Sequence, residues 1–306
     1  ENLFLLFLVG GTYHLVRWAK TDNLKQLLAG ALHILLLTLV RYEGYAVFLA
    51  ATVFVATREF VRSKKWVTTE GKTVLFVTLA GFGIVLWTIY LWAIFGDPLY
   101  WQKIYSHQKS IISTDTVLEL KTFADQTAQP TGNKGHPLNS AWSYFQVVAY
   151  MSGIGLTIIS AALIPLFAIK EKIWKRPYLL GVGLLLITFL FIVFTLTSGG
   201  IPLTLPEMNL NTIFNYQTNF ANEYNIRYGL LTLPLVVVLF AWLLSLNKVT
   251  FVLGSLLIVA HLLSPLQRGF TLYYQLPVKW NTGSATNSAE DSAVAWFREN
   301  YTDGLI

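Results

Sequence analysis

Eight apolar runs constrain the fold of this chain more than any other feature of its sequence. A helix needs about 20 residues to cross the roughly 30 Å hydrocarbon core of a membrane, and these runs with their flanks approach that length. Of the 306 residues, 54% are hydrophobic and only 12% are charged. Soluble domains carry about twice that charged fraction. The sequence therefore predicts an all-α, polytopic transmembrane helix bundle of eight spans, at residues 2–16, 26–40, 44–57, 74–95, 144–169, 179–197, 229–246 and 249–265.

The basic residues indicate how these spans are oriented. Lys and Arg collect on the cytoplasmic side of membrane proteins, and 13 of the 22 in this chain lie in four alternate connectors. We therefore expect those connectors to be cytoplasmic and the long loops to be extracytoplasmic. The second run reaches span length if its helix starts at Asp22, a good N-cap residue. The basic connectors are 17–25, 58–73, 170–178 and 247–248.

The predicted spans and loops also indicate how the chain is divided into domains. Residues 1–265 are expected to form the transmembrane helical domain, with one extracytoplasmic loop at 96–143. Residues 266–306 are expected to begin an extracytoplasmic C-terminal segment. The chain opens directly on an apolar run without a basic leader, and it ends where an amphipathic helix gives way to a further element. We therefore expect an internal fragment of a longer protein.

Several classes of function are disfavoured by composition. The chain has no cysteine, which excludes a disulfide framework, a thiolate zinc site and a catalytic thiol. It contains no Walker loop, GxSxG elbow or HExxH motif. The net charge of +6 lies in juxtamembrane clusters such as "REFVRSKKW", which topology and anionic head groups explain better than nucleic acid does. The expected partners therefore include membrane lipid and no nucleic acid.

Arg41, Tyr42 and Glu43 stand between two uncharged runs in "LLLTLVRYEGYAVFLAATVF". A charged group at membrane depth costs about 2.5–3.5 kcal/mol on insertion scales and often marks a substrate path. Adjacent positions on a helix or turn point apart, so we expect the two charges to face a shared cavity without necessarily pairing. The alternative is a tight turn whose charges touch lipid head groups.

Two further stretches carry candidate residues. In "NEYNIRYGLLTLPLVVVLFAW", Arg227 and Tyr228 open a late span, where a guanidinium beside helix N-terminal amides suits a phosphate or pyrophosphate. The alternative is an interfacial anchor. In "AIFGDPLYWQKIYSHQ", Asp97 follows a helix-breaking glycine and could cap the turn, bind a metal or contact a sugar. His33 and His261 lie inside spans and are expected to be hydrogen-bonded packing residues, while the spacing of His107 and His136 in the long loop matches no zinc pattern.

The chain resembles a family in the segments "ENLFLLFLVGGTYHLVRW", "LLLTLVRYEGYAVFL", "FGDPLYW" and "NIRYGLLTLPLVVVL", in that order. They are similar to polytopic glycosyltransferases of the type C fold (GT-C), the broad group that includes protein mannosyltransferase-like enzymes. The resemblance implies a multi-pass enzyme of the plasma membrane or endoplasmic reticulum. It would take a sugar from a polyprenyl- or dolichyl-phosphate donor and pass it to a glycan, lipid or protein acceptor on the extracytoplasmic or lumenal face. It names no cofactor and leaves a divalent cation open.

The resemblance also assigns roles. Arg41 or Arg227 would hold the donor phosphate, and Glu43 would be the catalytic-site carboxylate that orients Arg41 or binds a sugar hydroxyl or the acceptor. The base that activates the acceptor is expected upstream of residue 1. The tail from residue 288 is similar to the start of an extracytoplasmic domain that some members append. A transporter or lipid flippase is the alternative, which would show internal repeats around a midplane site. The predicted substrate-binding residues are Arg41, Tyr42, Arg227, Tyr228, Asp97 and Glu1.

Overall fold

The computed structural model describes residues 1–100, 135–170, 177–198 and 226–267, and the regular secondary structure in these ranges is helical throughout. The chain divides into two compact units, Glu1–Leu243 and Leu244–Ile306. The all-α class predicted from the sequence is therefore confirmed for the described part of the chain.

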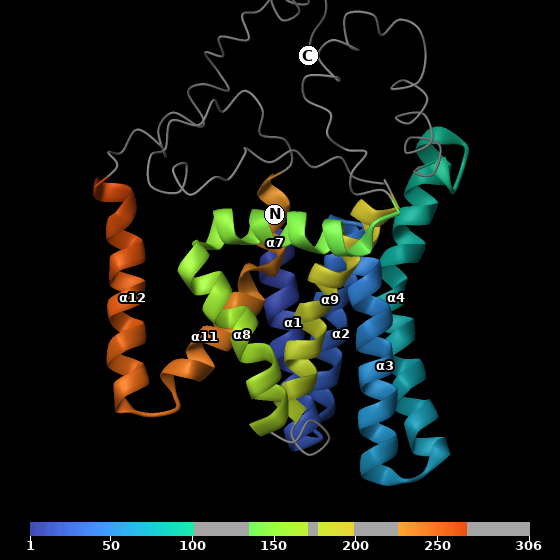
Figure 1. Cartoon of the computed structure of the whole chain (residues 1–306). Helices are drawn as coiled ribbons and strands as arrows, with labels where there is room; N and C mark the ends of the chain where they lie inside the picture. Colours follow the sequence, from blue (N-terminus) through green and yellow to red (C-terminus); the bar gives the residue numbers. More distant parts are fainter. Residues whose placement is uncertain (101–134, 171–176, 199–225, 268–306) are drawn as a thin grey trace, which may run out of the picture. The chain divides into compact units, whose positions relative to one another are not determined.

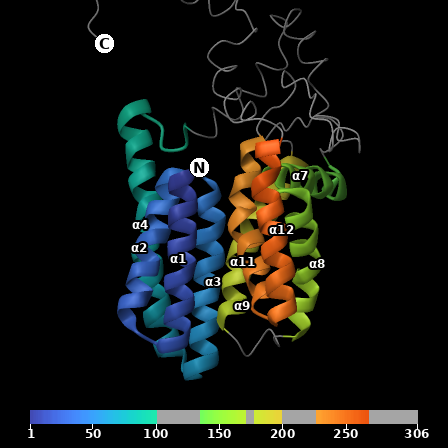
Figure 2. The same cartoon turned by 90° about the vertical axis from the view of Figure 1, so that its left-hand side faces the viewer.

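The first four helices run up and down in chain order (Figures 1 and 2). Connections of two residues separate them, which makes sequence neighbours antiparallel. Helix α1 packs on α2, and α4 packs on both α2 and α3. Glu1 and the connection between α2 and α3 consequently lie at one end, and the other two connections lie at the opposite end. The bounds are α1 (Asn2–Thr21), α2 (Leu24–Val40), α3 (Glu43–Ser63) and α4 (Trp66–Phe95).

The connection between α1 and α2 corrects one prediction. Asp22 does not open the second helix; it ends the first in the left-handed conformation (φ 56°), with its N–H donating to the carbonyl of Trp18. Asn23 is the N-cap of α2, and its Oδ1 accepts a hydrogen bond from the Lys25 N–H at 2.9 Å. Asp and Asn both tolerate the left-handed region and both cap helices well. Two such residues in a row leave the boundary ambiguous in the sequence.

The apolar run at 144–169, predicted as one span, is divided into two helices. They are α7 (Pro137–Ser152) and α8 (Ile154–Lys170), and Gly153 between them has φ 89° and ψ 130°. That conformation suits glycine and cannot continue a helix. Helix α7 lies across the ends of its neighbours instead of running alongside them (Figure 1). The loop predicted to extend to residue 143 therefore becomes helical at Pro137.

The remaining elements of the first unit complete the bundle. They are α9 (Pro177–Thr197), the 3-10 helix η3 (Ile226–Thr232) and α11 (Leu233–Leu244). Helix α9 packs against α1, α3 and α7, while η3 packs against α7 and α9. The late apolar run predicted at 229–246 thus begins in the 3-10 helix η3, and α11 follows it directly in the sequence.

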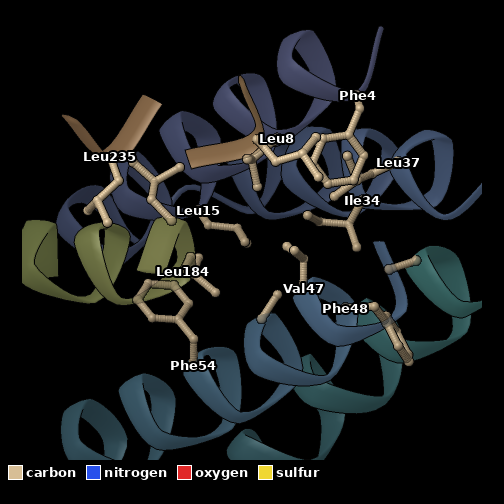
Figure 3. Packing of buried hydrophobic residues seen from close by; sticks show 14 of the residues in the cluster. Phe4, Leu8, Leu15, Ile34, Leu37, Val47, Phe48, Phe54, Leu184 and Leu235 are labelled. Carbon is tan, nitrogen blue, oxygen red and sulfur yellow. The ribbon is translucent and has the colours of Figure 1, made fainter. Parts of the chain in front are cut away.

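One continuous core joins these helices (Figure 3). In a bilayer, lipid chains are as apolar as the core, so helices associate through close van der Waals packing and not through exclusion of water. Large side chains from α1, α2, α3, α9 and α11 interdigitate there. Those labelled in the figure are Phe4, Leu8, Leu15, Ile34, Leu37, Val47, Phe48, Phe54, Leu184 and Leu235, all buried.

Charged side chains link α1, α3 and α4 at the end opposite Glu1. The carboxylate of Glu59 is only 1% exposed; its Oε1 accepts a hydrogen bond from Lys72 Nζ at 3.0 Å and its Oε2 lies 3.5 Å from Arg62 NH1. Asp22 pairs with both Arg62 and Lys72. Arg62 also donates to the carbonyl of Ala19 at 2.8 Å, where cations complement a helix C-terminus. This end holds residues 17–25 and 58–73, two of the four basic connectors that we expect from the sequence to be cytoplasmic.

Within the described ranges, three helices are long and apolar enough to cross a membrane. They are Glu43–Ser63, Trp66–Phe95 and Arg227–Leu244. Shorter apolar helices accompany them at Leu24–Val40, Gly155–Pro165, Gly181–Thr197 and Lys248–Ala260. These lengths and compositions support a membrane protein.

The second unit contains α12 (Lys248–Gln267) in its described part. Its start is fixed by reciprocal hydrogen bonds: Asn247 Oδ1 accepts from the Thr250 N–H at 2.9 Å, and Thr250 Oγ1 accepts from the Asn247 N–H at 3.2 Å. The domain boundary predicted after residue 265 lies near the end of α12. Residues 268–306, which hold the predicted C-terminal segment, lie outside the described ranges.

Candidate functional site

Arg41 and Glu43 form a two-pronged ion pair at the connection between α2 and α3. Arg41 has an extended backbone (φ −155°, ψ 150°), and Tyr42 is helical. The Nε and NH2 groups of Arg41 donate to the two oxygens of Glu43 at 3.0 and 2.8 Å. The sequence left the pairing of these charges open, and the structure pairs them. The expectation took helix or turn geometry at Arg41, whereas the backbone there is extended and only Tyr42, between the two residues, is helical.

Glu1 contacts the remaining edge of the same guanidinium. Arg41 NH1 donates to Glu1 Oε1 at 2.8 Å across 40 sequence positions. The exposed fractions of the side chains are 18% for Arg41, 23% for Glu1 and 7% for Glu43. Burial by itself would lower the pKa of Arg41, but the hydrogen bond and charge of Glu43, with the charge of Glu1, raise it above its ordinary value. Arg41 is therefore a permanent cation in this setting.

The 3-10 helix η3 brings two more predicted residues to this place. The guanidinium of Arg41 lies over the ring of Tyr228, 4.9 Å from the ring centroid, which is within cation–π range. Arg227 Nε lies 3.5 Å from Glu1 Oε1, and its side chain is 60% exposed. Residues distant in the chain are thus gathered at one end of the bundle. We call this group the Arg41 cluster: Glu1, Arg41, Glu43, Arg227 and Tyr228.

Tyr144 on α7 positions η3, and sequence analysis missed it. Its side chain is fully buried, and its hydroxyl donates to the carbonyl of Tyr228 at 2.8 Å. The hydroxyl has a single hydrogen, so Thr232 Oγ1, 2.9 Å away, donates to Tyr144 in turn. At Gly229 a Cβ would lie 2.8 Å from the Val147 carbonyl, so glycine permits the close contact of η3 with α7.

Tyr144→Phe tests this positioning role. The substitution keeps the ring and leaves the Tyr228 carbonyl and the Thr232 hydroxyl without their shared partner. We expect a loss of about 1–2 kcal/mol in folding free energy, read as a lower melting temperature of the detergent-solubilised protein. Tyr90→Phe, at a half-exposed ring on α4, is the matched control and should leave the melting temperature unchanged. Equal melting temperatures for Tyr144→Phe and wild type would contradict the role.

Tyr42 and Asp97 occupy other surroundings. The Tyr42 ring makes edge contacts with Tyr45 at 5.8 Å and with Trp87 at 6.2 Å between centroids, which packs the start of α3 against α4. The Oδ1 of Asp97 accepts a hydrogen bond from the Leu99 N–H at 2.9 Å, in the turn that follows α4. That bond is the capping role, one of the alternatives left open by the sequence. Substrate binding by either residue stays a prediction.

The structure tests the predictions made for His33 and for a metal site, within the residues that it describes. His33 Nδ1 lies 2.8 Å from the Ala29 carbonyl, which confirms it as a hydrogen-bonded packing residue. The side chain of His261 lies outside the described residues. In the part of the chain that the structure describes, no group of three or more His, Asp or Glu side chains could hold a metal ion. The divalent cation left open by the sequence has no assigned ligands there.

Comparison with protein-family models, curated proteins and solved structures gave no match. The Arg41 cluster and the sequence resemblance are therefore the two features that point to a function.

Proposed function

We propose that this protein is a membrane glycosyltransferase. It transfers a sugar from a polyprenyl- or dolichyl-phosphate donor to a glycan, lipid or protein acceptor on the extracytoplasmic or lumenal face. The observation that carries the proposal is the convergence of Arg41 and Arg227 on one Glu1 oxygen, at 2.8 and 3.5 Å. Two guanidiniums at one end of an apolar helix bundle suit the phosphate of a lipid-borne donor.

The topology belongs to the same proposal. The eight apolar runs would form a multi-pass domain, with the basic end of α1–α4 in the cytoplasm and the Arg41 cluster on the opposite face. Charge inside a membrane domain is costly and tends to mark a functional path. A donor whose prenyl chain lies in the bilayer would present its phosphate near the end of a span. Arg41 lies at the end of one apolar helix and just before the next, which supports this arrangement.

The chemistry follows from the charge that develops during transfer. The bond between the anomeric carbon and the phosphate oxygen breaks, and the acceptor oxygen forms a new bond to that carbon. The electron pair leaves with the prenyl phosphate, and the acceptor proton goes to the general base that the family resemblance implies. Fixed guanidiniums stabilise the growing phosphate charge better than mobile water does. Arg41 and Arg227 would supply that stabilisation.

Glu43 acts as a positioning residue in this scheme. Both of its carboxylate oxygens bind Arg41, and its side chain is 7% exposed. That geometry favours the orienting role over direct binding of a sugar hydroxyl or the acceptor. It holds one edge of the Arg41 guanidinium and leaves NH1 directed at Glu1. Contact between Glu43 and the substrate stays a prediction from the sequence.

A lipid flippase would also benefit from paired guanidiniums, so the test must separate transfer from transport. The full-length protein is reconstituted in liposomes with prenyl-phosphate hexoses labelled in the sugar, and with a membrane extract as the source of acceptors. We expect label to move to acceptor and unsugared prenyl phosphate to appear in equal amount. Liposomes without protein provide the background. Movement of intact donor between leaflets, without loss of its sugar, would instead support the flippase.

A further inference from the structure

A single carboxylate oxygen bridges the two arginines of the cluster. Glu1 Oε1 lies 2.8 Å from Arg41 NH1 and 3.5 Å from Arg227 Nε. An oxygen shared by two guanidiniums takes the place that a phosphate oxygen takes in paired-arginine anion sites. The position of Glu1 Oε1 therefore marks the point in the cluster where an external anion meets both cations.

The two carboxylates of the cluster differ in how firmly they are held. Glu43 uses both oxygens on one edge of Arg41, at 3.0 and 2.8 Å, and is almost fully buried. Glu1 uses the same single oxygen for both arginines, its contact with Arg227 is long at 3.5 Å, and its side chain is 23% exposed. A two-pronged, buried pair is harder to open than a single, partly exposed contact. Glu1 is thus the exchangeable ligand and Glu43 the permanent one.

The charges of the cluster favour replacement of the Glu1 carboxylate by a phosphate group. Arg41, Arg227, Glu1 and Glu43 sum to zero net charge in the structure. A sugar linked to a prenol through one phosphate is a phosphodiester and carries one negative charge, the same as the Glu1 carboxylate. We propose that Glu1 occupies the seat of the donor phosphate and that the donor displaces it from Arg41 and Arg227. This inference rests on the proposed function, because it names a regulating group within the same site.

Displacement makes Glu1 a competitor of the donor. With Glu1 in contact with both arginines, the four side chains sum to zero charge and attract stray anions weakly. A phosphodiester presented by the membrane replaces the carboxylate without leaving either guanidinium unpaired. The released Glu1 carboxylate, already partly exposed, returns to water. Removing its charge should therefore strengthen donor binding, the opposite of what a direct substrate ligand would show.

Binding of methyl farnesyl phosphate, a prenyl phosphodiester, to the full-length protein in detergent tests this inference, with farnesol as the anion-free probe. Calorimetric titration should show that Glu1→Gln binds the diester about tenfold more tightly than wild type, a change typical of losing one charge-assisted hydrogen bond. Farnesol affinity should be the same for both proteins. Melting temperatures establish that both are folded.

Glu70→Gln is the matched control, because it removes the same charge from an exposed position near the basic end of α4. Its diester affinity should equal that of wild type. Diester binding by Glu1→Gln that is equal to or weaker than wild-type binding would overturn the competing role of Glu1 and leave the proposed function intact. A wild-type protein that binds diester no better than farnesol would instead count against the proposed function itself.

Discussion

Arg41→Ala is expected to lower sugar transfer about 100- to 1000-fold, the loss that follows removal of one fixed donor to a developing negative charge. Arg41 is the best-fixed cation of the cluster, since Glu43, Glu1 and the Tyr228 ring surround its guanidinium. Arg41→Lys should also lose most activity, because an ammonium keeps the charge and cannot make the two-pronged bond to Glu43. The measurement is the initial rate of label transfer from a prenyl-phosphate hexose.

The experiment must distinguish an Arg41→Ala protein that is unfolded from one that is folded and cannot transfer sugar. Arg41→Ala leaves the Glu43 carboxylate buried without its cation, and breaking such a pair costs about 3–5 kcal/mol. The double variant Arg41→Ala/Glu43→Ala removes both charges, so it should melt closer to wild type and still fail to transfer sugar. Arg17→Ala removes an exposed arginine that bonds the Tyr13 hydroxyl at the other end of α1 and should transfer normally. A folded Arg41→Ala protein with wild-type rates would remove Arg41 from the mechanism.

The helices were predictable because apolar runs of nearly span length leave the backbone few alternatives in a membrane. Their ends were less predictable. Asp22 and Asn23 are both good caps, and only the left-handed backbone at Asp22 decides which of them ends α1 and which opens α2. Gly153 breaks the run at 144–169 into α7 and α8, although glycines inside other spans leave their helices unbroken. The sequence alone does not distinguish these glycines.

The site was predictable where charge stood out against apolar neighbours. Arg41 and Glu43 interrupt two uncharged runs, Arg227 opens a late apolar run, and the resemblance added Glu1. Their pairing was not predictable, because it depends on an extended backbone at Arg41 that no local pattern announces. Tyr144 was missed for a related reason. An aromatic residue in an apolar run reads as core or interface, and only the fold shows its hydroxyl bonded to η3.

The second large expected effect concerns Gly44, which lies directly after Glu43 at the start of α3. A Cβ at this position would stand 2.7 Å from the Leu37 carbonyl oxygen, 2.9 Å from its carbon and 3.0 Å from Thr38 Cα. All of these are backbone atoms of α2, which cannot move aside as a side chain would. Gly44→Ala should therefore cost about 2–3 kcal/mol through overpacking, seen as a lower melting temperature of the solubilised protein.

Gly71→Ala supplies the matched control for this prediction. Gly71 lies within α4, and a Cβ there would meet nothing within 4 Å. Alanine is favoured over glycine in a helix by about 1 kcal/mol, so this variant should melt slightly above wild type. Because Gly44 adjoins Glu43, its displacement should also shift the carboxylate that orients Arg41 and lower sugar transfer. Gly44→Ala with wild-type melting and transfer would show that α2 and α3 yield at this contact, and that the Arg41 cluster does not depend on it.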